Sequence, residues 1–186
     1  MDYLDFSLHA GEIITISSDR FQVIREVEQL FKGEIVPRKG EIYVHQKPYR
    51  PRKKHQILKR FSIAVIENPM KDQLLLNLNF YDNLCISRGL QMRGFWYDRS
   101  LKNSIRDYVN QYMGEDFTDR KAAELTMAEK QRLLYLRWML CSPDVVVCVE
   151  PFKSVDKYLE EDAVDMILEM ARKGIAVIVL THNAEF

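Results

Sequence analysis

The sequence predicts an α/β fold with a mostly parallel sheet core and a helical subdomain. Two fully apolar runs, Val145–Val149 and Ile175–Leu180, are typical of strands buried on both faces of a parallel sheet. Between them apolar residues recur at helical spacing, and Gly174 follows where a helix C-terminal cap belongs. A strand, a helix and a second strand in this order predict a βαβ unit with a right-handed crossover.

Three further strands are expected in the first third of the chain, at Ile13–Ile16, Glu41–His45 and Ser62–Ile66. We expect Ile13–Ile16 to lie among the central parallel strands, together with the two C-terminal apolar runs. Over residues 81–135 the apolar period becomes helical, which predicts a helical subdomain inserted before the strand at Val145. Residues 1–186 therefore form a single domain.

The composition is that of a folded soluble domain and does not favour nucleic acid as a partner. Of 186 residues, 47% are hydrophobic, and Lys+Arg and Asp+Glu both number 27, so the formal net charge is zero. A local basic run at Lys47–Lys54 could contact nucleic acid, but a solvated surface is the favoured interpretation. The apolar runs are far shorter than the roughly 20 residues that span a bilayer, so no direct membrane insertion is expected. Three irregularly spaced cysteines indicate reduced thiols in a cytoplasmic protein.

Several segments, taken in order, resemble one protein family. Leu125–Arg132 leads into a helix, Ser142–Pro151 follows at once, and Val177–His182 comes third. These segments resemble the signature helix, the Walker B strand and the switch-histidine strand of ATP-binding-cassette (ABC) transporter ATPase domains. Upstream, Ala10–Ile13 and Pro37–Ile42 resemble the strand before Walker A and a later turn of the same family. The resemblance implies a P-loop NTPase-like fold.

Glu67 and the residues around it indicate a particular subgroup of this family. Glu67 stands in place of the usual Q-loop glutamine, and its surroundings are similar to the second ATPase half of ribose- and galactose-type sugar importers. In all, the resemblance covers about residues 6–186. It implies partners, namely a second ABC ATPase domain and membrane transporter subunits through which the protein would associate with the membrane. The family domain continues past the switch histidine, so we expect the parent protein to continue beyond Phe186 with the missing C-terminal part.

The segment that corresponds to Walker A lacks the residues that hold phosphate. A P-loop needs glycines, so that backbone N–H groups can approach the phosphates, and it needs a lysine and a Ser/Thr hydroxyl. Ser17–Arg25 contains no glycine and no lysine. Any nucleotide contacts left in this degenerate Walker A would come from Ser17, Ser18, Arg20 and Arg25. The favoured interpretation is a plain strand-to-helix turn.

The Walker B segment is also altered, and the roles of its glutamate and of the switch histidine have two interpretations each. By the resemblance, Val149 occupies the position of the aspartate that holds Mg²⁺, and an apolar side chain cannot do so. Glu150 occupies the position of the catalytic glutamate. It is either a base or, as we favour in the absence of metal and phosphate, a solvated strand-end carboxylate. His182 is either a contact for the γ-phosphate or a structural residue, and the sequence leaves both open.

The signature and D-loop positions have structural interpretations as well. Thr126 and Glu129 lie in the signature segment, but Met127 replaces a glycine there and adds bulk. Thr126 is also a good N-cap for the helix that follows, which is the favoured interpretation. Asp156, at the D-loop position, would face a partner ATPase domain or favour the first turn of a helix.

These losses lead to one leading hypothesis and two rivals. The leading hypothesis is a degenerate ABC-type domain that does not hydrolyse ATP and acts as a regulatory or interaction module. No ATP, Mg²⁺ or other metal is then expected, and the partner is another ABC ATPase domain or a fused regulatory domain. One rival is an ATP-binding subunit of a sugar importer that binds ATP and Mg²⁺ with a competent partner ATPase domain. The other is a nucleic-acid-associated regulator that uses the basic run.

Overall fold

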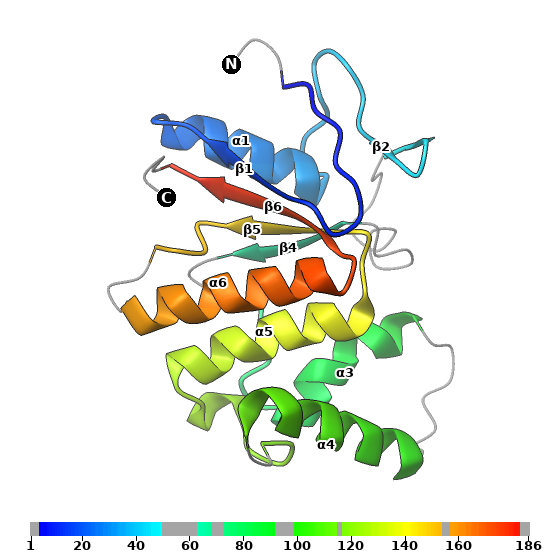
Figure 1. Cartoon of the computed structure of the whole chain (residues 1–186), viewed down its shortest axis with the longest axis vertical. Helices are drawn as coiled ribbons and strands as arrows, with labels where there is room; N and C mark the ends of the chain where they lie inside the picture. Colours follow the sequence, from blue (N-terminus) through cyan, green and yellow to red (C-terminus); the bar gives the residue numbers. More distant parts are fainter. Residues whose placement is uncertain are drawn as a thin grey trace.

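The computed structural model describes residues 4–49, 63–67, 73–91, 99–114, 117–153 and 157–182. In these residues a four-stranded parallel sheet lies between helix α1 on one face and helices α5 and α6 on the other (Figure 1). The strand order is β1-β6-β5-β4, with β1 at Ile13–Ser17, β6 at Ala176–Thr181, β5 at Val145–Val149 and β4 at Ile63–Glu67.

Most of the helices lie on one side of the sheet. Helix α1, on the other side, spans Phe21–Lys32 and ends at Gly33, which has a left-handed backbone with φ 69°. The remaining helices are α3 at Phe80–Gln91, α4 at Arg99–Met113, the 3-10 turn η1 at Ala122–Glu124, α5 at Met127–Cys141 and α6 at Lys157–Arg172. Helix α3 packs on α5, and α4 lies outermost in this layer (Figure 1). A short antiparallel hairpin joins β2 at Tyr43–Val44 to β3 at Lys47–Pro48.

Alternation along β5 divides the core into two layers. Val147 and Val149 face the cluster under α1, whereas Val146 and Cys148 face the larger cluster under α5 and α6. Helix α1 supplies its cluster with side chains at helical spacing, Ile24, Val27 and Phe31. Burying each such side chain contributes roughly 1.5–3 kcal/mol. The nearly unbroken apolar sequence of β5 is therefore a consequence of burial on both faces.

The predicted βαβ unit is confirmed. Strands β5 and β6 are parallel neighbours, with Val145 opposite Ala176, and α6 connects them. The helix buries one face, made of Ala163, Met166, Ile167 and Met170. Gly174, just after the helix, has φ 82°, as expected for a residue that ends a helix and turns the chain back.

Two strand predictions need correction. The strand near Ile13 is parallel, as predicted, but it lies at one edge of the sheet and not at its centre. Of its side chains only Ile16 is buried, whereas Ile13, Thr15 and Ser17 are exposed. The strand predicted at Glu41–His45 is only two residues long. His45 and Gln46 have positive φ values and form the hairpin turn, which ends it.

All three cysteines are buried, and none of them forms a disulfide within the described residues. Within the part of the chain that the structure describes, none of the helices combines the length and the apolar character needed to cross a membrane. The part of the basic run that follows Tyr49 lies outside the described residues.

Candidate nucleotide site

The carboxyl ends of the parallel strands meet at one edge of the sheet. Ser17 at the end of β1 lies opposite Thr181 of β6, and Val149 of β5 lies opposite Leu180. This register brings the turn after β1 together with Glu150 and His182. The edge therefore collects three of the sequence-predicted features: the Walker A position, the Walker B glutamate and the switch histidine.

The turn at the Walker A position bonds to the protein itself. The backbone N–H of Ser18 donates to the carbonyl of Thr181 over 3.2 Å, and Ser18 Oγ accepts from the backbone N–H of Arg20 at 3.2 Å. Helix α1 then begins at Phe21, with Arg20 as its N-cap residue and no side-chain cap. Arg20 and Arg25 are both exposed to solvent. The chain thus passes from strand to helix through three residues.

The first turn of α1 carries an aromatic ring where it faces solvent. Phe21 is 55% exposed, and Nζ of Lys153 lies 5.7 Å from the centre of its ring. That separation permits a cation–π interaction between the turn after β5 and the start of α1. One helical turn further on, Ile24 is buried in the core. The helix start is therefore bordered by an aromatic and an ammonium group.

Glu150 and His182 contact each other directly. One carboxylate oxygen, Oε1 of Glu150, accepts the backbone N–H of His182 at 2.9 Å and lies 2.8 Å from Nδ1 of the same residue. The backbone N–H of Glu150 donates to the carbonyl of Leu180 at 2.7 Å. Glu150 is a non-glycine residue with φ 50°, in the left-handed region that costs free energy for L-residues. These contacts join the ends of β5 and β6. The prediction of a solvated carboxylate is wrong, because Glu150 is only 4% exposed.

Val149 occupies the position of the Mg²⁺-binding aspartate, and its side chain cannot bind a metal ion. Val149 is only 6% exposed and packs in the core under α1. Among the described residues, no group of three or more His, Cys, Asp and Glu side chains could hold a metal ion. Mg²⁺ prefers several oxygen ligands, so the residues present at this edge do not fit it well. Asp156 lies outside the described residues.

The signature position begins helix α5 with a capping box. Thr126 Oγ1 accepts the backbone N–H of Glu129 at 3.3 Å, and Glu129 accepts the backbone N–H of Thr126 at 2.7 Å. Burial opposes the charge on Glu129, but its hydrogen bonds with Thr126 and the nearby Arg120 outweigh burial and lower its pKa. Both signature residues are therefore engaged in starting the helix, while Met127 is 54% exposed.

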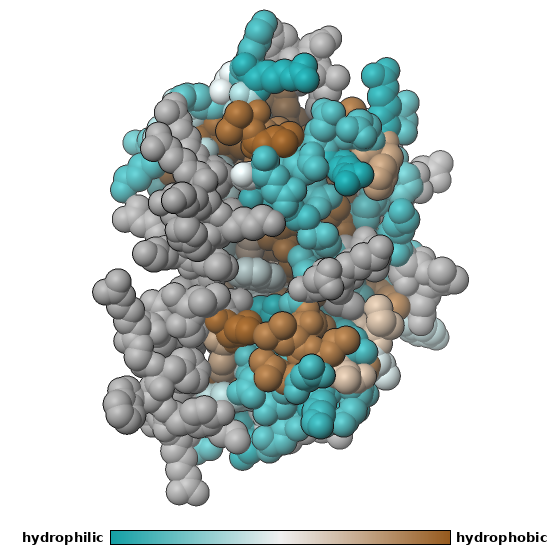
Figure 2. All heavy atoms as spheres, turned by 180° about the vertical axis from the view of Figure 1, so that it is seen from behind, coloured by the Kyte–Doolittle hydropathy of each residue, from teal (hydrophilic) through white to brown (hydrophobic). Residues whose placement is uncertain are grey.

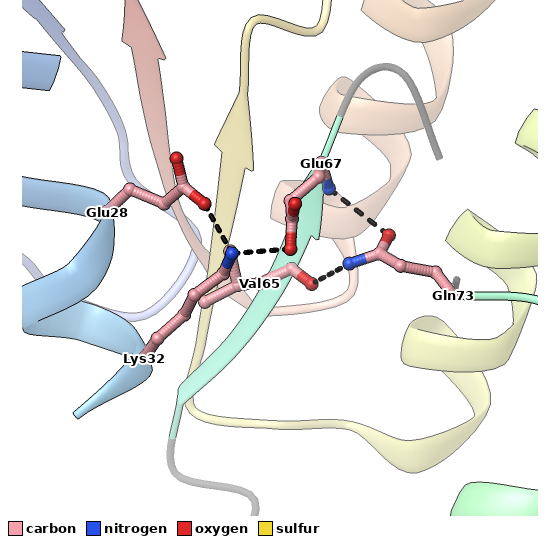
Figure 3. Close-up of polar contacts among 5 residues, drawn as sticks. All are labelled: Glu28, Lys32, Val65, Glu67 and Gln73. Carbon is pink, nitrogen blue, oxygen red and sulfur yellow. Dashed lines mark hydrogen bonds and ion pairs between the residues drawn. The ribbon is translucent and has the colours of Figure 1, made fainter. Parts of the chain in front are cut away.

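Glu67 lies in a different environment from the rest of the predicted site. Its carboxylate is 2.5 Å from Nζ of Lys32 in α1, and Lys32 also pairs with Glu28 (Figure 3). Burial opposes the charge on Lys32, but the hydrogen bonds to Glu28 and Glu67 outweigh it and raise its pKa. The side chain of Gln73 bonds to two backbone groups of β4, Val65 O at 3.1 Å and Glu67 N–H at 3.2 Å (Figure 3).

A buried polar cluster that the sequence did not reveal lies behind Gln73. Arg137 of α5 donates to the carbonyls of Asn83 at 2.8 Å and Gln73 at 2.7 Å, and to Asn83 Oδ1 at 3.1 Å. Asn83 is fully buried, and its amide donates to the carbonyls of Leu75, Leu78 and Asn79. Burial lowers the pKa of Arg137 to about 10.

These elements and their order match the fold of ABC ATPase cassettes. The chain resembles the ATPase domains of ABC transporters, and in particular those of sugar importers. It is 22% identical over 185 residues to the ribose import ATP-binding protein RbsA of Geobacillus kaustophilus, and 20% identical over 183 residues to that of Streptococcus agalactiae. In each case the match covers 97% of this chain and 37% of the relative, so the chain spans little more than a third of these proteins. No protein-family model matches the chain.

Solved ABC cassettes share the fold. The structure of cbiO1 from Clostridium perfringens, part of the cbiONQ complex, superposes with a TM-score of 0.78 at 20% identity, over 97% of this chain and 70% of that one. The dimeric cassette MJ0796 bound to ADP and Pi superposes with a TM-score of 0.74 at 16% identity, over 96% and 78% of the two chains. The predicted fold class is confirmed.

Proposed function

We propose that this chain is a non-hydrolysing ABC-type domain that serves as a regulatory or interaction module. One observation carries the proposal. The turn between β1 and α1 bonds to the protein itself, through Ser18 N–H to Thr181 O and Arg20 N–H to Ser18 Oγ, and it has no glycine. A phosphate cradle requires backbone N–H groups that are free and can be approached closely.

Two other positions support the same proposal. Val149 is buried among apolar side chains at the position where an Mg²⁺-binding carboxylate would be needed. Met127 places an exposed thioether at the start of α5, and Thr126 is already engaged in the capping box. Because the cradle, the metal ligand and the signature are all changed, no ATP or Mg²⁺ is proposed as a cofactor.

The proposed partner is another ABC ATPase domain or a fused regulatory domain. The MJ0796 cassette is dimeric, and cbiO1 is part of a transporter complex. The similarity to these cassettes supports another ABC ATPase domain as the partner. Exposed apolar side chains give this chain surface for such contacts, Leu75 and Leu76 among them at 46% and 49% exposure. Figure 2 shows hydrophobic residues gathered in two separate areas of the rear face, each bordered by hydrophilic ones.

A second candidate function is an ATP-binding subunit of a sugar importer that works with a competent partner ATPase domain. The names of the relatives favour it, since the matched proteins import ribose. Glu150 and His182, which lie together at the sheet edge, also favour it. Under this candidate ATP and Mg²⁺ would bind, and the protein would lie at the cytoplasmic side of the membrane through transporter subunits.

Thermal denaturation with and without Mg-ATP separates the two candidates. A ligand at 100 times its Kd stabilises the folded state by about 2.7 kcal/mol. We expect millimolar Mg-ATP to leave the Tm unchanged, with ATP plus EDTA as the matched control and an active ABC ATPase as the positive control. A rise in Tm that depends on Mg²⁺ would contradict the leading proposal and support the importer subunit. Sedimentation under the same conditions should likewise show no nucleotide-driven dimer.

A further inference from the structure

The contact between Glu150 and His182 determines which ring nitrogen of the histidine carries the proton. Oε1 of Glu150 receives the backbone N–H of His182 at 2.9 Å and lies 2.8 Å from Nδ1. An ionised carboxylate only accepts hydrogen bonds, so a neutral ring held at this distance must donate from Nδ1. The hydrogen bond of one ring nitrogen sets the state of the other, so Nε2 is then left with a lone pair.

We propose that Glu150 is a positioning residue that holds neutral His182 as the Nδ1–H tautomer. The sheet edge therefore presents His182 Nε2 as a hydrogen-bond acceptor. Among the described residues, Nε2 has no hydrogen-bond partner, and the His182 side chain is 34% exposed while that of Glu150 is 5% exposed. The group that can bind there is a donor, such as a hydroxyl or an amide N–H of a partner protein.

This inference rests on the proposed function, and it also supplies a reason for it. An ionised phosphate oxygen is only an acceptor, and two acceptors cannot form a hydrogen bond with each other. Neutral His182 in this tautomer therefore does not contact phosphate through Nε2. In this tautomer the sheet edge favours a hydrogen-bond donor over an ionised phosphate oxygen.

The backbone of Glu150 suggests the variant that best tests the inference. With φ 50°, this position accepts glycine without strain, so Glu150→Gly removes the carboxylate while relieving the backbone. Glu150→Gln is the conservative partner variant. Its amide oxygen can accept both bonds, since the backbone N–H of His182 orients that oxygen toward the ring.

Nitrogen-15 NMR of the histidine rings reads the tautomer directly. The full chain is measured at about pH 8.5, and a His182→Gln variant assigns the signals. We expect a protonated Nδ1 and an unprotonated Nε2 in the natural chain and in Glu150→Gln, and a mixture of tautomers in Glu150→Gly. Because the natural chain is informative by itself, the test does not depend on any variant folding.

Four outcomes decide the matter. A protonated Nε2 in the natural chain, or an unchanged ring in Glu150→Gly, overturns the inference. Added inorganic phosphate should leave Nε2 unprotonated, and its conversion to a donor would also overturn it. Stabilisation by Mg-ATP alongside an Nδ1–H ring would overturn the proposed function but support the positioning role of Glu150.

Discussion

Glu150 and Glu12 make the same two contacts with a histidine in very different surroundings. Glu12 Oε2 accepts the backbone N–H of His9 at 2.7 Å and lies 3.1 Å from its Nδ1, as Glu150 Oε1 does with His182 at 2.9 and 2.8 Å. The first pair is 51% and 77% exposed (Glu12 and His9), whereas the second is 5% and 34% exposed. Hydrogen bonding to His9 lowers the pKa of Glu12.

The two pairs have similar geometry but differ in burial and in sequence separation, and these differences are expected to decide what each contact contributes to stability. Glu12 and His9 are three residues apart in a turn, and water competes for every group in the pair. Glu150 and His182 are 32 residues apart and tie the ends of two neighbouring strands. A contact between residues far apart in the chain, with a buried carboxylate, can fix a single geometry. An exposed local contact is readily exchanged for hydrogen bonds to water.

Arg137 extends the comparison to a buried side chain with three hydrogen bonds, and we expect the largest effect there. Arg137→Met removes three donors from the carbonyls of Gln73 and Asn83 and from Asn83 Oδ1. Leaving buried acceptors unpaired costs about 1–3 kcal/mol each, so the expected loss is about 3–5 kcal/mol in the free energy of unfolding. Urea denaturation measures it, with Arg25→Met on the exposed surface of α1 as the control. A loss below 1 kcal/mol would show that burial is not the deciding factor.

Glu150 and Glu12 themselves come next. Glu150→Ala removes a buried carboxylate that accepts from His182, so we expect a loss of about 1.5–3 kcal/mol in the free energy of unfolding. Glu12→Ala removes the same pair of contacts in water, and urea midpoints should barely change. Equal losses for the two substitutions would show that burial does not decide what this contact contributes to stability.

Thr126 tests how much an exposed hydrogen bond between residues close in the sequence contributes to stability. Thr126→Ala removes the acceptor for Glu129 N–H, and we expect a loss of about 1 kcal/mol. The pKa of Glu129 is lower in the folded chain than its ordinary 4.5. This part of the stability is therefore complete above about pH 4.5 and is lost as pH falls through the folded value. Thermal melts at pH 7 and pH 3.5 should show that the variant differs less from the natural chain in acid.

Lys32 should give the smallest effect. Lys32→Met breaks the ion pairs with Glu67 and Glu28 on a partly exposed surface, so we expect a loss below about 1 kcal/mol that shrinks further in high salt. Melts in 0.05 and 1 M NaCl check this. A large loss that persists in salt would mean that the pair acts as a buried one.

The parts of the fold that could be predicted are those with a local or periodic signal. Val145–Val149 was predicted with its observed bounds because a fully apolar run has one simple explanation, burial on both faces. The capping role of Thr126 could be read from Thr126 and Glu129, three residues apart. The edge position of Ile13–Ser17 was missed, although the exposed Thr15 and Ser17 alternate with apolar residues and indicate an open face.

The contacts that were missed join residues far apart in the chain. Lys32 and Glu67 are 35 positions apart, and Arg137 and Asn83 are 54 apart. A single sequence carries no record of which charged groups meet across such distances. The meeting of Glu150 and His182 followed from the parallel strands that carry them, but their direct hydrogen bond did not. Whether the site residues act on nucleotide stays a prediction.

The side chain of Gln73 has a consequence for how the molecule behaves in concentrated solution. Val65 O and Glu67 N–H are the backbone groups that an edge strand offers to any neighbouring strand, and the carboxamide of Gln73 occupies both. The amide side chain thereby imitates one residue of a fifth strand. Among the described residues β4 is an edge strand, and the uncharged Gln73 side chain leaves it fewer unpaired backbone groups for edge-to-edge pairing with another copy.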